Sequence, residues 1–171
     1  REIQNVEDKL SIEPSNHHIV NCYSNRGFLK WTEMLPNLVS EEGAIWLLDA
    51  AFGVGEQKDW FCGLTQSGTI SPEDTMASHS WEEYIGTTHQ WRPPLNFIPH
   101  DPKTAAQTYT SAKSSQFVIH EAGMITGSFM VSENTIGWNQ GLLYGITLFN
   151  NAHSVVQGDS IYITVILGSK I

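Results

Sequence analysis

Seven histidines and the adjacent glutamates Glu82 and Glu83 are the residues of this chain whose types could do chemistry. His17 and His18 are neighbours, and on a strand the side chains of neighbours point to opposite faces. His79 and His89 lie ten residues apart with a tryptophan between them, a spacing that matches no metal-ligand motif. We therefore predict histidines that face solvent or are hydrogen-bonded, and no metal site.

The adjacent acids Glu82 and Glu83 could serve a glycosidase, which needs two carboxyl groups on opposite sides of a sugar. Neighbours in sequence do not provide that separation, so the fold would have to bring in a second acid such as Glu73 or Asp74. We predict instead that these acids are solvated or cap helices. An enzyme such as a glycan depolymerase remains only a third hypothesis.

The cysteines Cys22 and Cys62 lie among apolar and aromatic residues, which favours two buried thiols and leaves a disulfide as the alternative. Neither lies in a local signature of a cysteine nucleophile with a histidine base. Gly53 and Gly55 follow a predicted helix instead of preceding one, so they end that helix and do not form a phosphate loop. The sequence predicts no catalytic residue, no cofactor and no enzymatic activity.

Composition narrows the partners of the protein. Among 171 residues, 9 Lys and Arg stand against 18 Asp and Glu, a formal charge of -9. Nucleic-acid binding needs clustered cations, so DNA and RNA are not expected partners. The longest apolar stretch is far short of the roughly 20 residues of a membrane helix. The chain begins at Arg1, which suggests either a processed product or part of a longer sequence.

The elements that must position any functional residue are mainly strands. Short segments rich in Val, Ile, Thr, Tyr and Phe alternate with glycine and asparagine in the last third of the chain, at 116–120, 124–131, 141–149 and 160–167. This pattern is typical of consecutive antiparallel strands. It predicts a mainly β protein, an antiparallel sandwich of jelly-roll-like type.

The first part of the chain predicts an arm followed by a hairpin. Residues 1–20 are polar with sparse apolar positions, which favours an extended N-terminal arm, and 21–171 then form a single sandwich domain. A strand pair is predicted at 19–23 and 28–34, joined by a turn at 24–27 that contains Asn25 and Gly27. A buried strand is expected at 60–64.

One amphipathic helix is predicted at about 41–52. Ser40 suits its N-cap, and Gly53 suits the left-handed residue after its C-terminus. Ile45, Leu48 and Phe52 recur at i, i+3 and i+7, and Trp46 and Leu47 widen this face. The pattern predicts that the face is buried as core packing and is not a site.

A second, short helix is predicted around 72–77, because Ser71 and Pro72 suit an N-cap and a first helical position. The following segment, 78–106, is rich in Trp, Pro and His and predicts a long, partly irregular connection. Long loops of this kind often carry function, so a contact surface is expected there.

The six tryptophans divide by their surroundings. Trp31, Trp46 and Trp60 lie in apolar patterns and are predicted to be core residues. Trp81, Trp91 and Trp138 lie in loop-like segments, so they are the candidate interface residues. A protein interface and a carbohydrate-binding surface both use exposed aromatic residues, and both alternatives stay open.

Several segments, in order along about 29–167, resemble a family of small virion structural proteins of tailed bacteriophages and prophages. The segments are Leu29-Lys30-Trp31-Thr32-Glu33-Met34-Leu35-Pro36-Asn37-Leu38-Val39, Leu47-Leu48-Asp49, Phe52-Gly53, Trp60-Phe61-Cys62-Gly63-Leu64, Asp74-Thr75-Met76-Ala77-Ser78-His79-Ser80-Trp81-Glu82-Glu83, Trp91-Arg92-Pro93, Ile125-Thr126-Gly127-Ser128-Phe129-Met130-Val131-Ser132, Gly141-Leu142-Leu143-Tyr144 and Val155-Val156-Gln157-Gly158-Asp159. The resemblance implies a structural component of the particle, without enzymatic activity.

The resemblance leads to an expected function and location. We expect a non-enzymatic protein on the surface of a virion, a capsid decoration (cement) protein or head-fibre base that stabilises the shell by subunit contacts. Its partners would be the major capsid protein or other virion proteins, in a homo-oligomer that is guessed to be a trimer. The alternative is a tail-associated receptor-binding or fibre module that recognises host surface glycans.

Overall fold

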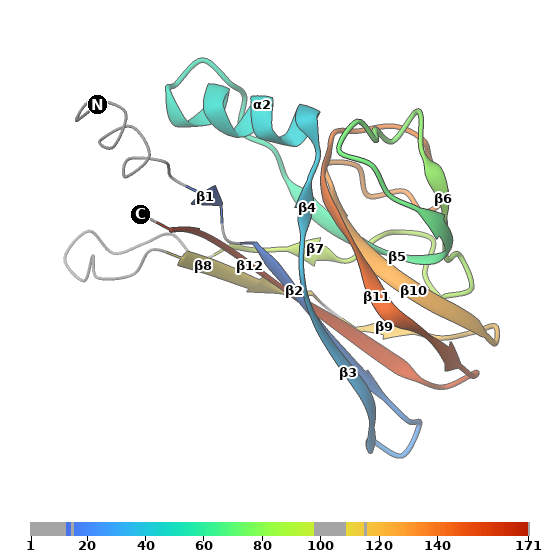
Figure 1. Ribbon diagram of the computed structural model, residues 1–171. Coiled ribbons are helices and arrows are strands. Elements are labelled where there is room, and N and C mark those ends of the chain that lie inside the picture. Colours follow the sequence, from blue (N-terminus) through green and yellow to red (C-terminus); the bar gives the residue numbers. More distant parts are fainter. Residues whose placement is uncertain (1–12, 15, 98–108, 115, 171) are drawn as a thin grey trace.

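The computed structural model describes residues 13–14, 16–97, 109–114 and 116–170, which form two antiparallel sheets and one helix (Figure 1). The first sheet is centred on the C-terminal strand, with which four other strands pair directly. Its strands are β1 (Glu13–Pro14), β2 (His17–Tyr23), β3 (Leu29–Pro36), β8 (Tyr109–Lys113), β9 (Phe117–Val118) and β12 (Ser160–Lys170).

The second sheet has the order β4-β11-β10-β5-β6, and β7 also pairs with β5. Its strands are β4 (Leu38–Val39), β5 (Trp60–Thr69), β6 (Ser80–Glu83), β7 (Pro94–Leu95), β10 (Gly123–Val131) and β11 (Leu143–Val155). The two sheets curl and pack on each other, so the predicted antiparallel β-sandwich is confirmed. The four segments predicted in the last third of the chain correspond to β9, β10, β11 and β12.

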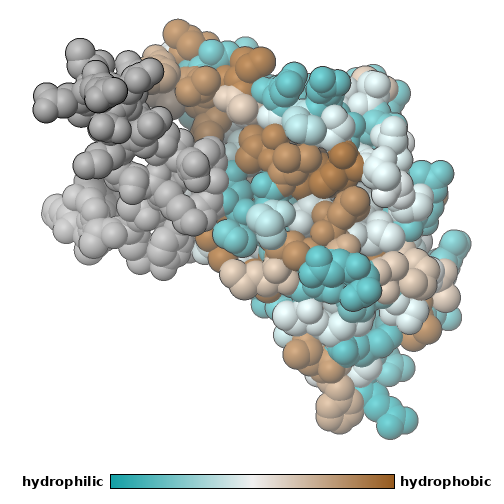
Figure 2. Space-filling view, viewed as in Figure 1, coloured by the Kyte–Doolittle hydropathy of each residue, from teal (hydrophilic) through white to brown (hydrophobic). Residues whose placement is uncertain are grey.

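The helix α2 (Glu41–Ala51) follows β4 and lies at one end of the sandwich, at the top of Figure 1. Its predicted bounds are confirmed, since Ser40 is the N-cap and Gly53 has a φ of 76°. Figure 2, seen from the same side, shows apolar surface gathered over this helix.

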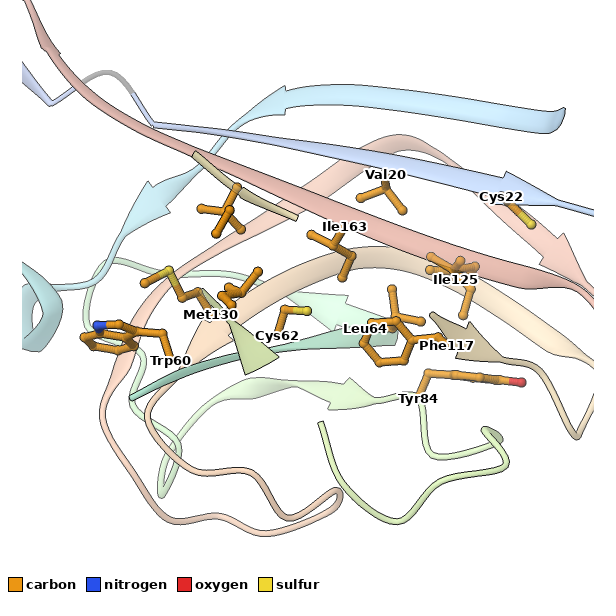
Figure 3. Close-up of a cluster of buried hydrophobic side chains, with 14 of the residues drawn as sticks. Val20, Cys22, Trp60, Cys62, Leu64, Tyr84, Phe117, Ile125, Met130 and Ile163 are labelled. Atoms are coloured by element: carbon orange, nitrogen blue, oxygen red, sulfur yellow. The ribbon is translucent and has the colours of Figure 1, made fainter. Parts of the chain in front are cut away.

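The main core lies between the sheets, because each sheet turns one face of alternating residues inward. Val20 of β2 and Ile163 of β12 are fully buried and meet Leu64, Ile125 and Met130 from the second sheet (Figure 3). A smaller core covers the other face of the second sheet. Its buried members are Met76, Trp81, Phe129, Val131, Leu143 and Ile146.

The N-terminal boundary differs from the prediction. Residues 1–12 of the predicted arm lie outside the described residues. Glu13–Pro14, however, pair with β12, and His17–Val20 belong to β2, so the predicted domain start at residue 21 falls inside a strand. The hairpin of β2 and β3 is confirmed, with Gly27 at a φ of 82° in its turn.

The short helix predicted at 72–77 is wrong, because this segment forms two consecutive turns. Asp74 closes the first turn: its backbone N–H donates to the Ser71 carbonyl at 3.1 Å, and its carboxylate accepts the Ser71 N–H at 2.9 Å. Thr75 and Ser78 pair with each other in the second turn, which directs Met76 into the smaller core. The segment therefore covers that core.

Both cysteines are free and buried, one on each sheet, so the two-thiol prediction is confirmed (Figure 3). Burial raises the pKa of the Cys22 thiol to about 11 and that of Cys62 to about 12. The thiolate is the reactive form of cysteine, so neither thiol is prepared to act as a nucleophile.

Candidate binding surfaces

Helix α2 is held on the sandwich by the side that carries small and polar residues. The Ser40 side chain accepts the Gly43 N–H at 2.9 Å and donates to the Leu143 carbonyl, and the Ser40 N–H donates to the Tyr144 carbonyl at 3.0 Å. The Glu42 carboxylate accepts the Leu143 N–H at 2.7 Å. These bonds tie the first turn of the helix to the start of β11.

Close approach of the helix to β11 depends on Gly43. A Cβ atom at this position would lie 2.3 Å from the Tyr144 carbonyl oxygen, which no side chain tolerates. One turn further on, the Trp46 ring packs edge-on against Trp60 with centroids 4.8 Å apart, and its Nε1 donates to the Glu56 carbonyl at 3.0 Å. The side of α2 toward the sandwich thus consists of buried Gly43 and of half-buried Glu42, Trp46 and Ala50.

The predicted buried face of the helix is wrong except at Trp46, which is half-buried. Ile45 and Leu48 follow Gly43 and Trp46 by two residues each, which is about 200° around a helix, so they point away from the sandwich. Their side chains are 61% and 60% exposed, and that of Phe52 is 79% exposed. Together with the exposed Val54, these residues form an apolar surface, named here the helix face.

The surroundings of the helix face are acidic. Glu41 and Asp49 are exposed on α2, and the helix contains no lysine or arginine. Trp46 and Leu47 also line an open hollow of about 600 Å³ between α2 and β7, whose other walls include Trp60, Phe97 and Tyr144. An apolar ridge beside an aromatic hollow can bury a complementary protein surface.

The three candidate interface tryptophans do not share one environment. The prediction of Trp81 as an interface residue is wrong. Its side chain is only 2% exposed, stacks on His79 and packs against Phe129 in the smaller core. It is buried because β6 pairs with β5 and places it under the turns at 71–79. Trp91 and Trp138 are 59% and 55% exposed.

The loops that carry Trp91 and Trp138 are joined by a buried ion pair. Arg92 is fully buried, and its Nε and Nη2 donate to the two Glu83 carboxylate oxygens, each at 2.8 Å. Its Nη1 donates to the Glu133 carbonyl at 2.8 Å, and Nη2 donates to the Trp138 carbonyl at 3.0 Å. Glu83 in turn accepts the Gly137 N–H at 2.7 Å.

Backbone contacts between the two loops add to this ion pair. Trp91 and Thr135 form an antiparallel bridge, and the Ile136 N–H donates to the Gln90 carbonyl at 3.0 Å. The two exposed tryptophans therefore stand on one connected scaffold. Together with the exposed side chains beside them, they are named here the tryptophan platform. Those side chains are Thr88, His89, Gln90, Asn139 and Gln140, and the His89 ring stacks on Trp91.

The acids proposed for a glycosidase separate in the fold. Glu82 is exposed and accepts the Ser67 hydroxyl at 3.0 Å, as expected for a solvated acid. Glu83 is not solvated, because it is the partner of buried Arg92. Both carboxylate oxygens of Glu83 already accept hydrogen bonds from Arg92, and one also accepts the Gly137 N–H. Glu82 and Glu83 are therefore not placed as the two carboxyl groups that flank a glycosidic bond.

Two of the histidines have structural roles. His18 is buried with Nδ1 2.7 Å from the Ser128 hydroxyl, and burial, helped by neighbouring His17, lowers its pKa to about 3. His153 pairs with Glu33 at 2.6 Å and stacks on Trp31. Within the described part of the chain, no three His, Cys, Asp or Glu side chains are grouped to hold a metal ion.

Comparisons of the chain with protein-family models, with curated proteins and with solved structures found no match. None of the helices among the described residues has the length and apolar character needed to cross a membrane.

Sequence reasoning missed Arg92 and the outward face of α2. A signal for Arg92 was present, since it is the only Lys or Arg between Lys58 and Lys103 and stands among aromatic residues. A lone cation in such surroundings indicates a buried role. Nothing within the helix sequence reveals which side meets β11.

Proposed function

We propose that this protein is a non-enzymatic structural protein that binds another protein through the helix face. The observation that carries the proposal is the orientation of α2, which packs on the sandwich through Gly43 and Trp46 and leaves Ile45, Leu48 and Phe52 in water. Contiguous exposed apolar surface of this kind is typical of a protein contact site. Anchors at i, i+3 and i+7 suit a helix that lies in an apolar groove.

The charges around the helix face also indicate which kind of partner it binds. Exposed Glu41, Asp49 and Glu56 lie around the apolar residues, and Lys58, which lines a hollow with Ile45 and Asp49, balances only one of these three charges. A second copy of the same helix would bring acids against acids. The favoured partner is a protein whose apolar groove has lysine or arginine at its rim, because opposite charges steer and orient an encounter.

The resemblance to small virion proteins supplies a candidate for that partner. On this proposal the chain is a capsid decoration protein or head-fibre base at the surface of a tailed-phage particle, and the groove belongs to the major capsid protein or another virion protein. Burial of the helix face between subunits would then raise the stability of the shell.

A capsid-binding assay tests this function. The full chain is mixed with emptied capsids prepared without it, and co-sedimentation and the disruption temperature of the capsids are measured. We expect binding and a higher disruption temperature. Phe52→Ser should weaken binding at least about tenfold, the effect of losing one buried anchor.

Phe28→Ser is the matched control, because Phe28 is also highly exposed but lies in the turn between β2 and β3. It should bind as the unaltered chain does. Failure of the unaltered chain to bind capsids would exclude the shell as the partner. Equal binding by the Phe28 and Phe52 variants would exclude the helix face as the contact.

A further inference from the structure

The tryptophan platform differs from the helix face in that charged side chains are absent from it. The segments 84–91 and 134–140 contain no Asp, Glu, Lys or Arg. The exposed groups around Trp91 and Trp138 are instead the imidazole of His89, which stacks on Trp91, and the amides of Gln90, Asn139 and Gln140. Exposed indoles surrounded by neutral hydrogen-bonding groups are an unusual combination in a protein with a formal charge of -9.

We propose that the tryptophan platform binds a neutral saccharide. A sugar ring has an apolar face of C–H groups, which can pack on the face of an indole, and a rim of hydroxyl groups. Side-chain amides both donate and accept hydrogen bonds, so they match hydroxyl groups that do the same. This site is separate from the helix face and adds a binding activity to the proposed structural role.

The state of Arg92 argues against an anionic ligand. An acidic sugar or a phosphate would need a cation, and Arg92 is the only Lys or Arg between Lys58 and Lys103. Its side chain is fully buried, and Nε, Nη1 and Nη2 all donate to Glu83 or to backbone carbonyls. It cannot reach a ligand on the surface.

The platform is organised before any ligand arrives. The Arg92–Glu83 pair and the Gly137 N–H bond to Glu83 join the loop of Trp91 to the loop of Trp138. A ligand then does not have to order the loops, which lowers the entropic cost of binding. Rigid aromatic anchors beside adaptable polar side chains are also how antibody loops form binding surfaces.

Calorimetry and ligand-observed NMR with the full chain test the proposal. The probes are maltotetraose, cellotetraose and N-acetylchitotetraose, with tetragalacturonate as the anionic comparison. We expect at least one neutral probe to bind with a dissociation constant of about 1 mM or tighter. Trp91→Ala and Trp138→Ala should each weaken it about tenfold, and Trp91→Tyr, which keeps a ring, should weaken it less.

Phe52→Ser is the control on the other surface and should bind the saccharide unchanged. Circular dichroism verifies that each variant is folded, and the exposure of both tryptophans makes this outcome expected. The proposal is overturned if none of the neutral probes binds, if the anionic probe binds most tightly, or if binding survives both tryptophan substitutions. Any of these results leaves the capsid assay of the helix face unaffected.

Discussion

The helix face is mainly aliphatic, flanked by acids and carried by α2 and the turn after it, whereas the tryptophan platform is aromatic and carried by two loops without acidic or basic residues. Both leave large apolar side chains in water. Their surroundings nevertheless select different ligands: acids favour a partner with a basic rim, and neutral amides favour hydroxyl groups. The neighbours of an exposed apolar residue indicate its partner more clearly than the residue itself does.

The two surfaces also differ in how they are held. Gly43 lets the α2 backbone approach β11, so the helix depends on the absence of a side chain. The platform depends on the presence of one, because Arg92 connects Glu83 with the carbonyls of Glu133 and Trp138. Separate substitutions should therefore release each surface alone.

The largest expected effect comes from Arg92→Leu. The substitution leaves the Glu83 carboxylate without its counter-charge, and breaking a buried pair in this way costs about 3–5 kcal/mol. We expect this loss in the free energy of unfolding measured with urea, together with loss of saccharide binding. Arg26→Leu is the matched control, since Arg26 is exposed and should change stability by less than about 0.5 kcal/mol.

Replacing both Arg92 and Glu83 separates the cost of an unpaired buried charge from the cost of lost packing. Arg92→Leu with Glu83→Leu removes the unpaired carboxylate and should recover part of the lost stability. Saccharide binding should stay lost, because the loops are no longer joined. An Arg92→Leu variant as stable as the Arg26→Leu control would show that the ion pair does not hold the platform.

Gly43→Ala should release the helix face at a smaller cost. Alanine favours an isolated helix over glycine by about 1 kcal/mol, so propensity alone predicts a gain. The clash with the Tyr144 carbonyl should reverse that sign, with a net loss of about 1–3 kcal/mol. Hydrogen exchange should show faster exchange at α2 and unchanged exchange in the loops of Trp91 and Trp138.

Ala44→Gly is the control for this substitution, because Ala44 is exposed and its change tests propensity without a clash. It should cost about 1 kcal/mol. A Gly43→Ala variant more stable than the unaltered chain would mean that α2 does not pack closely on β11.

Acid should unfold the helix face and the tryptophan platform together, because both are attached to the same core. His18 of β2 lies against Ser128 of β10, and its pKa falls from 6.5 to about 3 because burial disfavours the charged form. Below about pH 6.5, His18 therefore becomes protonated in the unfolded chain but stays neutral in the folded chain. The free energy of unfolding therefore decreases as the pH falls from about 6.5 towards 3, by at most about 1.4 kcal/mol per pH unit.

Urea unfolding across this pH range, followed by tryptophan fluorescence and far-UV circular dichroism, measures the effect. Both signals should report one transition. His18→Asn removes the titrating group, so its stability should fall less steeply with acid. Equal slopes for the variant and the unaltered chain would exclude His18 as the cause.

The sequence predicted those features that depend on near neighbours. Alternation and turn residues located β10, β11 and β12, and the Ser40 cap and Gly53 located the ends of α2. Both signals act within a few residues, so they survive without knowledge of the fold. Loop-like surroundings made Trp81, Trp91 and Trp138 candidate interface residues; Trp91 and Trp138 are exposed, whereas Trp81 is buried.

Features that depend on distant partners were not predictable. The orientation of α2 follows from the approach of Gly43 to Tyr144, which lies about a hundred residues away along the chain. Trp81 is buried because β6 pairs with β5, and Glu83 is occupied because two loops bring Arg92 and Gly137 to it. Patterns within one segment contain none of this information.

The smallest expected effect is the most direct test of the helix face. Ile45 is 61% exposed and Ile146 is 1% exposed, so the two residues form a matched pair on α2 and β11. Ile45→Ala should change the free energy of unfolding by no more than about 0.5 kcal/mol, whereas Ile146→Ala should cost about 2–5 kcal/mol. Equal losses would mean that something covers the helix face in solution. A loss at Ile45 that grows with protein concentration would identify a second copy of the chain as the cover, and would replace the partner with a basic rim.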